Sequence, residues 1–417
     1  MEEWKEVRLG DYCDFQNGYA FKSSEFKTNG EYKIVKIKEL KDGLVKFFDD
    51  SASVDVQDIK EFEKYKIYRN DVLFALTGDP VSKPNPLSWV GRVSIYRSDE
   101  NALLNQRTCK IKESEKFDNQ FLYYYFRQWD NFYALASKAT GSASQANIST
   151  NTIADTIIKL PPLPTQQKIA AILSSLDDKI ELNNKINTNL EQQAQALFKN
   201  RFGIHRIVHK ESEKENLPND WLYYSFESLC SQIKPGTNFQ PARVPIGIPF
   251  LNVRNISKGY IDISDVKYIT EKDFDKVHKT WVPEENDILL SRIGTLGLVA
   301  VIRKTDLPLA VHYNFIDIKT KKVPFEFIFF LLKSEKFRAA YKLITKQSVQ
   351  EYVTIDEVAA LQIPLPNLET LDYCNFDVFK NIYKQMELNQ IENEKISILR
   401  DHLLPKLMNG EIFCCNK

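Results

Sequence analysis

The chain has 417 residues, and its 56 lysines and arginines are balanced by 56 aspartates and glutamates, so it carries no net charge at neutral pH. A chain of this length is expected to hold more than one domain. The balance argues against a uniformly basic protein that coats nucleic acid, although it leaves local basic faces open. Because the N-terminus has no apolar signal region and no run of about 18 apolar residues occurs, we expect a soluble cytoplasmic protein with no membrane contact.

The first 160 residues are predicted to form a globular domain of mixed α and β structure. Alternating polar and apolar residues and short apolar runs indicate strands. A segment rich in Phe, Tyr and Trp favours a helix, and a run of small polar residues favours a loop. Strands are therefore expected at 33–38, 71–76 and 90–96, the helix at 117–135 and the loop at 140–149.

Residues 161–204 are predicted to be dominated by one long helix that acts as a spacer or a dimerisation rod. The proline-rich segment Leu160–Pro164 is expected to stay outside the helix, with Thr165 as the N-cap. From Thr165 to Asn200 the helix would be about 54 Å long. Apolar residues recur at spacings of three and four, as in a helix that packs along another helix. This first seam comprises Ile169, Leu173, Leu176, Ile180, Asn183, Asn187, Leu190, Ala194 and Leu197.

The same pattern then restarts. Residues 205–362 are predicted to form a second globular domain, which begins with a charged, weakly structured linker at 205–216. Residues 363–417 are predicted to form a second helical spacer, again after a proline-punctuated segment at 363–368, and Pro405 leaves the last turn of this helix open. The second seam comprises Phe379, Ile382, Met386, Asn389, Asn393, Ile396, Arg400, Leu403 and Leu407.

The two halves of the chain correspond in several places. The second seam follows the first at an offset of 206 residues, and both seam asparagines recur in step. Trp221 follows Trp4 at an offset of 217, and residues 287–290 follow residues 71–74 at an offset of 216. The offset falls once, as a shorter loop in the second half would produce. We therefore predict a mixed α+β fold, a tandem duplication with pseudo-two-fold symmetry that alternates two α/β domains with two long helices.

Two helices related by a pseudo-two-fold axis should run antiparallel and form a coiled coil. In one register the numbers of facing residues add to 576, so that Asn187 meets Asn389 and Asn183 meets Asn393. Apolar residues face apolar residues in the other layers, except that Arg400 faces a leucine and would extend its stem over the seam. The paired asparagines would fix the register at some cost in stability.

Motifs that would carry catalysis are weak or missing. Gly78-Asp79-Pro80 follows a predicted strand, but no Gly-Lys-Ser/Thr follows it and no Walker A sequence occurs. The cysteines form no CxxC pair or zinc-spaced cluster, which predicts a reducing compartment and no metal site. The five histidines form no evident catalytic triad. The sequence therefore predicts a binding protein rather than an enzyme.

Each half offers polar loops between its short strands. Arg, Asn and Gln are the side chains that read base edges with two hydrogen bonds, and Lys, Ser and Thr position phosphates. A single loop of this kind is usually only a solvated surface, but the paired arrangement favours nucleic-acid binding. The candidate DNA-binding residues are Gln16, Tyr19, Lys38, Thr77, Lys83, Arg107, Ser144 and Gln145 in the first half, and Arg254, Asn255, Ser291, Arg292, Thr295, His312, Asn314 and Gln350 in the second.

Several segments carry a likeness to a known family. They are Trp4, Trp221, Asp71-Val72-Leu73, Arg292–Gly297, Leu160–Leu163 with Gln166–Ile169, and Leu403–Ile412. On these residues, and on the alternation of domains and helices, the chain resembles the specificity subunits of type I restriction–modification systems. The resemblance spans nearly the whole chain, and the architecture is more diagnostic than any one motif.

The resemblance implies a non-catalytic subunit with two target-recognition domains, each reading one half of a split site in double-stranded DNA. The long helices would separate the domains and dock two methyltransferase subunits, which a restriction-translocase subunit would join. S-adenosylmethionine, ATP and magnesium would bind to those partners, and this chain would hold no cofactor. One departure is that residues 367–371 lack the Gln-Gln-Lys found at 166–168, so the two docking faces are expected to be unequal.

A competing interpretation is a coiled-coil scaffold with two ligand-binding domains and no role at DNA, which the neutral net charge supports best. Salt-dependent binding of duplex DNA by the chain with its methyltransferase partner separates the two interpretations. An autonomous nuclease or methylase is disfavoured by the missing motifs. The bases recognised depend on loop geometry and DNA shape, which the sequence alone does not specify.

Overall fold

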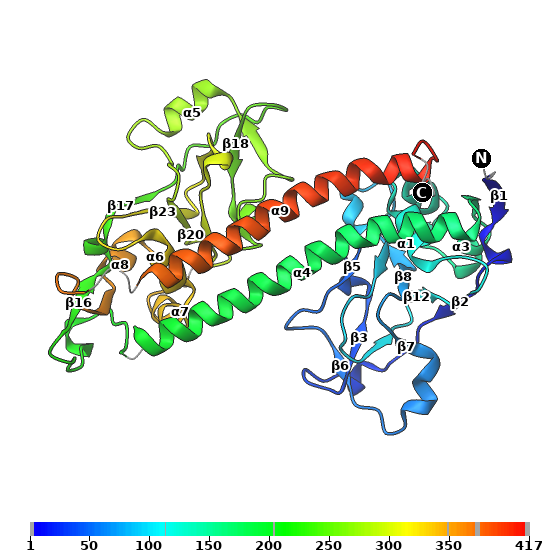
Figure 1. The fold of residues 1–417 in the computed structure, drawn as a ribbon, viewed down its shortest axis with the longest axis horizontal. Helices are drawn as coiled ribbons and strands as arrows, with labels where there is room; N and C mark the ends of the chain where they lie inside the picture. The colour runs from blue at the N-terminus through cyan, green and yellow to red at the C-terminus, as the bar shows by residue number, and fades with distance from the viewer. Residues whose placement is uncertain (1–3, 113, 203–204, 348–349, 372–375, 413–417) are drawn as a thin grey trace. The chain divides into compact units, whose positions relative to one another are not determined.

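The computed structural model describes residues 4–112, 114–202, 205–347, 350–371 and 376–412 (Figure 1). The chain divides into two compact units, one made of Met1–Leu182 with Glu392–Lys417 and the other of Asn183–Ile391. The division passes through the two longest helices, α4 (Leu163–Arg201) and α9 (Asp377–Met408). Each unit therefore contains one globular domain together with a portion of both helices.

The globular domain of the first unit is built mainly on two sheets, of six and four strands. Strand β8 (Val72–Ala75) is buried at all four positions because its residues are uniformly apolar. Helix α1 (Asn119–Arg127) covers this strand, and the rings of Phe126 and Phe74 meet with centroids 5.2 Å apart. The larger sheet has the order β2 (Phe15–Asn17), β12 (Thr108–Ile111), β8 (Val72–Ala75), β10 (Val93–Ile95), β5 (Leu44–Val45), β4 (Leu40–Lys41). The smaller has the order β6 (Ser53–Val54), β3 (Tyr32–Val35), β11 (Ala102–Leu104), β7 (Lys66–Ile67).

The second unit repeats this topology. Its larger sheet occupies the places of β2, β12, β8 and β10, and its smaller sheet those of β6, β3 and β11. The larger has the order β17 (Cys230–Pro235), β23 (Phe315–Thr320), β20 (Ile288–Ser291), β21 (Val299–Val301), and the smaller β19 (Lys267–Ile269), β18 (Ile248–Leu251), β22 (Ala310–Val311). The same strand order in both units confirms the predicted duplication and the mixed α+β fold.

Small details recur with the topology. Asn70 and Asn286, which precede the central strands, adopt left-handed backbone conformations with φ of 74° and 71°, which Asn tolerates. The next residue in each unit, Asp71 or Asp287, accepts a hydrogen bond from the backbone N–H three residues earlier, at 3.0 and 2.8 Å. These equivalent turns lie 216 residues apart, as the sequence offset predicted.

The predicted fall in the offset lies in one loop. The segment between β8 and β10 spans residues 76–92, whereas the matching segment between β20 and β21 spans residues 292–298. The longer loop closes on itself through a backbone bond from Asp79 to Ser88 of 2.8 Å. Its extra length accounts for the change from 216 to 206.

The predicted single helix at 117–135 is two helices, so that prediction was wrong. Gln128 has an extended backbone (ψ 132°) and ends the first helix, and Ser334 does the same in the second unit (ψ 151°). Ser334 caps α7 by accepting from the Phe337 backbone N–H, which is a local signal, whereas Gln128 is neither Gly, Pro nor a capping residue and gives none. The helices of the globular domains are α1 (Asn119–Arg127), α2 (Trp129–Ala136), α3 (Thr150–Ala154), α5 (Glu271–Val277), α6 (Phe325–Lys333), α7 (Glu335–Leu343) and α8 (Ile355–Ala360).

The predicted loop at 140–149 contains a hairpin, which corrects the sequence interpretation. Strand β13 (Thr140–Ser142) pairs with β14 (Gln145–Asn147), and β14 pairs with β9 (Thr77–Gly78). Small polar residues have little preference for strands, so the pairing with β9 decides this conformation.

The starts and ends of the long helices also differ from the prediction. Leu163 and Pro164 lie in the first turn of α4, and Thr165 lies inside the helix rather than capping it. Proline is tolerated there because the first-turn N–H groups have no acceptor within the helix. Helix α9 continues through Pro405 to Met408. The segments before the two helices are strands, with β15 (Ile157–Leu160) pairing with β1 (Lys5–Arg8), and β24 (Gln362–Pro366) with β16 (Trp221–Ser225).

Within each unit the two long helices pack through the predicted seams. In the second unit, the Asn389 Nδ2 donates to the Asn187 Oδ1 at 2.7 Å, and the Asn187 Nδ2 donates to the Met386 carbonyl at 3.0 Å. This contact has the predicted register and joins the end of α4 to the start of α9. In the first unit, Leu173 and Leu403 belong to one apolar cluster, which joins the start of α4 to the end of α9. The helices therefore pair antiparallel in both units.

The other seam residues are buried or half-buried, as a packed seam requires. These residues are Leu176, Ile180, Asn183, Leu190, Ile382, Asn393 and Ile396. The predicted meeting of Asn183 with Asn393 joins the two units and stays a prediction. None of the helices in the described ranges has the length and apolarity of a membrane span.

A buried ion pair of the first unit is replaced by a carboxylate pair in the second. Lys110 of β12 donates to Asp71 at 2.8 Å, and both side chains are largely buried. The residue that matches Lys110 is Asp317 of β23, which is fully buried beside Asp287, the match of Asp71. Burial and the Asp287 charge raise the pKa of Asp317 well above its usual value, and burial raises the pKa of Asp287 to about 6.

These two carboxyls make the stability of the second unit depend on pH. Since both pKa values are higher in the folded than in the unfolded chain, their contribution is complete below about pH 4 and is lost as the pH rises through about 6 and beyond. We expect Asp317→Asn to raise the local free energy of unfolding at about pH 8 by about 1–3 kcal/mol. Asp317→Lys, which restores the ion pair of the first unit, should have the same effect.

Hydrogen exchange of β20 and β23, corrected for intrinsic rates, measures this effect. Protection in the native sequence should fall between about pH 5 and about pH 8, and the fall should shrink in Asp317→Asn. Asp275→Asn, on the exposed surface of α5, is the control and should keep the native pH dependence. The same pH dependence in Asp317→Asn would contradict the assignment.

Candidate nucleic-acid interface

In the first unit, several strands end at the same sheet edge. Strands β3 and β11 run parallel, so the turn that carries Lys38 and the loop that carries Arg107 leave from neighbouring strand ends. Strands β2 and β8 both run antiparallel to β12 and therefore end beside its start. Backbone bonds of 2.9 Å join Gln106 to Tyr19 and Leu76 to Arg107. The first edge, so formed, comprises Tyr19, Lys38, Thr77, Gln106 and Arg107.

Neighbouring residues of the same domain support the side chains of the first edge. Tyr19, which is 38% exposed, rests against the rings of Phe21 and Phe62 with centroids 4.9 and 5.2 Å apart. Thr77 donates to the Asn147 Oδ1 at 2.9 Å, which ties the edge to the β13–β14 hairpin. Arg107 is exposed. The first edge therefore exposes the Tyr19 ring and the Arg107 guanidinium, and the packing beneath Tyr19 and the Thr77 hydrogen bond hold the edge in place.

The second unit builds an equivalent edge. Thr237 donates its backbone N–H to Val311 at 2.9 Å, and Tyr313 donates to Thr237 at 2.8 Å. Arg292 donates its backbone N–H to Asn314 at 2.8 Å, as Leu76 does to Arg107 in the first unit. The second edge comprises Thr237, Arg254, Arg292, His312 and Asn314.

A glycine explains why both edges share one backbone path. A Cβ on Gly18 would lie 2.0 Å from the Asn105 carbonyl oxygen, and a Cβ on Gly236 would lie 2.2 Å from the His312 carbonyl oxygen. Only glycine permits this close approach at either position. The residues that flank this glycine differ between the two units. Tyr19, which follows Gly18 in the first edge, corresponds to Thr237, which follows Gly236 in the second.

Two half-buried residues of the second edge, His312 and Arg292, have lowered pKa values. Burial and the nearby Arg243 charge lower the pKa of His312, although Asn314 opposes the shift, so the imidazole is neutral at neutral pH. A neutral imidazole offers one donor and one acceptor. Burial also lowers the pKa of Arg292, whose guanidinium stays charged and donates from Nε to the Val353 carbonyl at 3.0 Å.

Two predicted binding residues serve as supports instead. Asn255 is 3% exposed, and its amide accepts from Asn252 at 2.9 Å and donates to Asp262 at 3.0 Å. It thereby holds the turn that exposes Arg254. Ser291 is fully buried, and its hydroxyl donates to the Thr295 carbonyl at 2.7 Å. Both side chains are already engaged within their loops, which the sequence could not reveal.

The other predicted residues lie around the two edges. Gln16 lies on β2 and donates to the neighbouring Asn17 carbonyl at 2.7 Å. Lys38, within the first edge, forms an ion pair with Asp50 at 2.9 Å. Lys83 is exposed on the long loop of the first unit. Ser144 and Gln145 at the β13–β14 turn, and Thr295 and Gln350 in the second unit, are also exposed. DNA contact by these residues stays a prediction.

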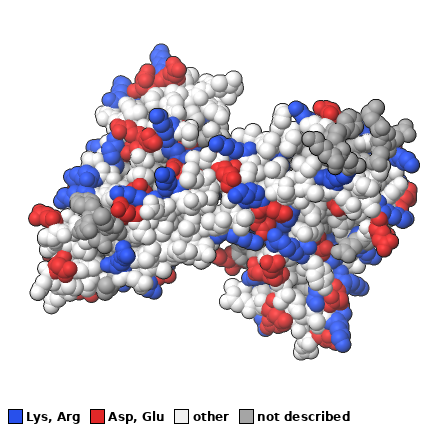
Figure 2. All heavy atoms as spheres, in the orientation of Figure 1, with Lys and Arg blue, Asp and Glu red and all other residues white. Residues whose placement is uncertain are grey.

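Sequence reasoning missed Thr237 and left Gln106 out of the candidate residues. The signal that finds Thr237 is the match of Gly18 with Gly236, because each glycine directly precedes an edge residue. On the face shown in Figure 2, Lys and Arg side chains are interspersed with Asp and Glu. In the described part of the chain, no group of three or more His, Cys, Asp or Glu is placed to hold a metal ion.

Comparisons with known proteins agree with this duplicated arrangement. The family model described as type I restriction modification DNA specificity domain matches the chain over residues 1–192 and 218–397. The EcoBI type I restriction enzyme specificity subunit of Escherichia coli is 23% identical over 99% of this chain and 86% of its own length. The MjaVIII specificity subunit of Methanocaldococcus jannaschii is 24% identical over 99% of this chain and 93% of its own.

A solved structure shares the fold. The crystal structure of a type I restriction–modification system S subunit from M. genitalium is 16% identical, with a TM-score of 0.54, and covers 97% of this chain and 96% of its own. Each range matched by the family model contains one globular domain and one edge. The chain therefore belongs to the family of type I restriction–modification DNA specificity subunits, which are not themselves catalytic and whose complexes carry their cofactors on partner subunits.

Proposed function

We propose that residues 1–160 and 205–362 each read one half of a split site in duplex DNA, the first through the first edge and the second through the second edge. The observation that carries this proposal is that the two edges present different side chains on equivalent backbone. Arg107 of the first edge corresponds to Asn314 of the second. Arg pairs with guanine and Asn with adenine in the major groove, so one scaffold is suited to two different half-sites.

The proposal includes two copies of a methyltransferase subunit as partners. Each unit has a hollow where its broken helix pair faces a long helix. The first, of about 420 Å³, is lined by Gln128 and Leu404 among others, and the second, of about 590 Å³, by Ser334 and Phe198. These residues correspond at the offset of 206. Equivalent hollows in the two units suit two copies of one partner, which a restriction-translocase subunit would join.

Binding of the assembled methyltransferase complex to DNA tests the proposal. The complex should prefer a duplex that carries its motif over a scrambled duplex, and the logarithm of the binding constant should fall linearly with the logarithm of the salt concentration. In this experiment S-adenosylmethionine, ATP and magnesium are added for the partner subunits. Equal affinity for motif and scrambled duplex at all salt concentrations would favour a scaffold without a role at DNA.

A further inference from the structure

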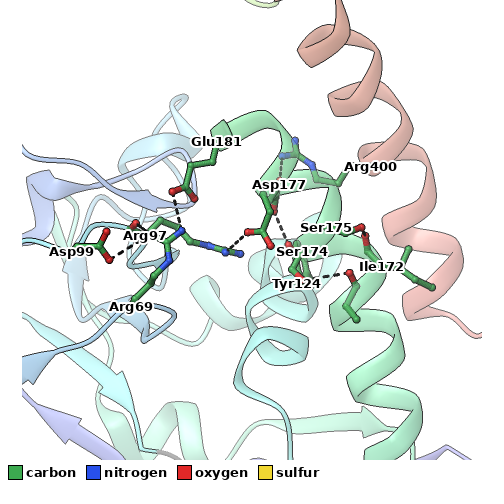
Figure 3. A network of polar contacts seen from close by, with 12 residues as sticks. Arg69, Arg97, Asp99, Tyr124, Ile172, Ser174, Ser175, Asp177, Glu181 and Arg400 are labelled. Atoms are coloured by element: carbon green, nitrogen blue, oxygen red, sulfur yellow. Dashed lines mark hydrogen bonds and ion pairs between the residues drawn. The ribbon is translucent and has the colours of Figure 1, made fainter. Parts of the chain in front are cut away.

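A network of charged and polar side chains fastens the first globular domain to helix α4, and α4 to the end of α9 that carries Arg400 (Figure 3). The Arg400 Nη1 donates to the Asp177 Oδ1 at 2.7 Å, and the Tyr124 hydroxyl donates to the Asp177 Oδ2 at 2.6 Å. One turn further along α4, Arg69 donates to Glu181 at 2.9 Å. Arg97 donates to Asp178 at 2.6 Å. These residues, Arg69, Arg97, Tyr124, Asp177, Asp178, Glu181 and Arg400, are called the polar joint.

The centre of the polar joint is shielded from water. The side chains of Asp177 and Arg400 are 18% and 21% exposed. Burial lowers the pKa of Arg400, but the charge of Asp177 and its hydrogen bond outweigh burial and raise the pKa overall. Burial and the Asp177 charge raise the pKa of Tyr124, so its hydroxyl keeps its proton and remains a donor. The contacts are therefore charged and directional at neutral pH.

The second unit uses different chemistry at the same place. At the offset of 206, Tyr383 replaces Asp177, Phe330 replaces Tyr124 and Ala194 replaces Arg400. Ala194 and Phe330 are fully buried. All three residues pack in or against the same apolar cluster. This apolar joint, made of Ala194, Phe330 and Tyr383, contains no counterpart of the Asp177–Arg400 pair.

A short, rigid path connects the polar joint to the first edge. Arg69 lies three residues before β8, and Arg97 lies two residues after β10, which pairs with β8. The other end of β8 leads directly into Thr77 of the first edge. The strand is fully buried and only about 13 Å long, so its orientation follows that of the side chains that hold its start.

We propose that the polar joint positions the first edge on DNA, with Asp177 and Arg400 as positioning residues, and that the second edge is positioned mainly by apolar packing. Beside the apolar joint, the Gln195 Nε2 donates to the Phe330 carbonyl at 3.0 Å and Lys333 forms an ion pair with Glu191 at 2.6 Å. This inference rests on the proposed reading of one half-site by each domain. Rigid presentation makes a mismatched base costly, because a loosely held domain can shift to accommodate it. Salt screens the more exposed ion pairs of the polar joint, Arg69–Glu181 and Arg97–Asp178, more than it affects apolar packing. Since the polar joint contains three ion pairs and the second unit has only Lys333–Glu191 beside its apolar joint among the described contacts, discrimination at the first half-site should weaken more steeply as salt rises than discrimination at the second.

Methylation rates of the assembled complex test this positioning role. Three duplexes are compared at about 50 mM and about 200 mM salt: the cognate site, a site with one base changed in the first half, and a site with one base changed in the second. Asp177→Asn should reduce the cognate-to-mismatch rate ratio for the first half about tenfold and leave the ratio for the second half unchanged. Phe330→Leu, in the apolar joint, should reduce the cognate-to-mismatch rate ratio for the second half and leave the ratio for the first half unchanged.

Two further variants separate positioning from folding. The reversed pair, Asp177→Arg with Arg400→Asp, should recover discrimination at the first half-site. Lys179→Gln removes an exposed ion pair of 3.0 Å with Glu392 on the same two helices and should change neither ratio. If Asp177→Asn lowers all rates by one factor and keeps both ratios, or if both ratios fall together, the positioning role is overturned. Absence of a split motif in the native complex would instead overturn the proposed function.

Discussion

Exchange of residues 1–160 for the matching domain of a relative with another target is expected to replace one half of the methylated motif and nothing else. The first edge lies wholly inside this segment and rests on strands that also lie inside it. The second edge lies wholly outside it. Since each mismatched base pair typically costs about 1–3 kcal/mol, the new half-motif should be complete rather than a broadened form of the old one.

Methylome sequencing of a host that carries the exchanged chain and its methyltransferase reads this result. The donor domain should keep arginines and a tyrosine that match Arg69, Arg97 and Tyr124, because these residues contact α4. The reciprocal exchange of residues 205–362 should change only the other half. A change in both halves after either exchange would show that the edges are not independent readers.

Lengthening both long helices by one heptad is expected to lengthen the unspecified gap between the two half-motifs. Seven residues inserted after Lys185 in α4 and seven after Ile391 in α9 keep the seams in phase, because the two sites face each other in the register of the Asn187–Asn389 contact. The insertion adds about 10 Å, or roughly three base pairs of DNA rise. The gap in the methylated motif should grow if DNA and partners tolerate the added twist.

A four-residue insertion at the same two sites is the matched control. It adds about 6 Å and turns each seam by roughly 40°, so it should weaken the helix pairing as well as the methylation. Its thermal unfolding should fall below that of the seven-residue variant. A seven-residue variant that methylates the original site with full efficiency and an unchanged gap would show that the helices do not set the spacing.

The duplication and the pairing of the long helices could be predicted from the sequence, because both depend on residues that recur at regular spacings. The seam asparagines recur at a constant offset, and Asn187 and Asn389 meet as that pattern predicts. Periodicity also located the central strands and the single change in offset. What it did not reveal is how a helix begins or breaks. Pro164 lies inside the first turn of α4, and Gln128 ends α1 without any local signal.

The candidate interface was only partly readable, because burial decides which polar residues face outward. Asn255 and Arg254 are adjacent and both of a type that reads bases, yet Asn255 is buried and holds the turn that exposes Arg254. The polar joint was missed for a similar reason. Asp177 lies beside the seam in the sequence, and its partner Tyr124 comes from a different element 53 residues away.

The most direct test of the central claim is the methylation pattern that the native chain produces. The chain is expressed with its methyltransferase partner in a host without other DNA methylation, and modified bases are mapped across the genome. The account predicts one motif made of two specified halves separated by a fixed, unspecified gap, and no methylation when this chain is omitted. A contiguous motif, or the same methylation without this chain, would contradict the account.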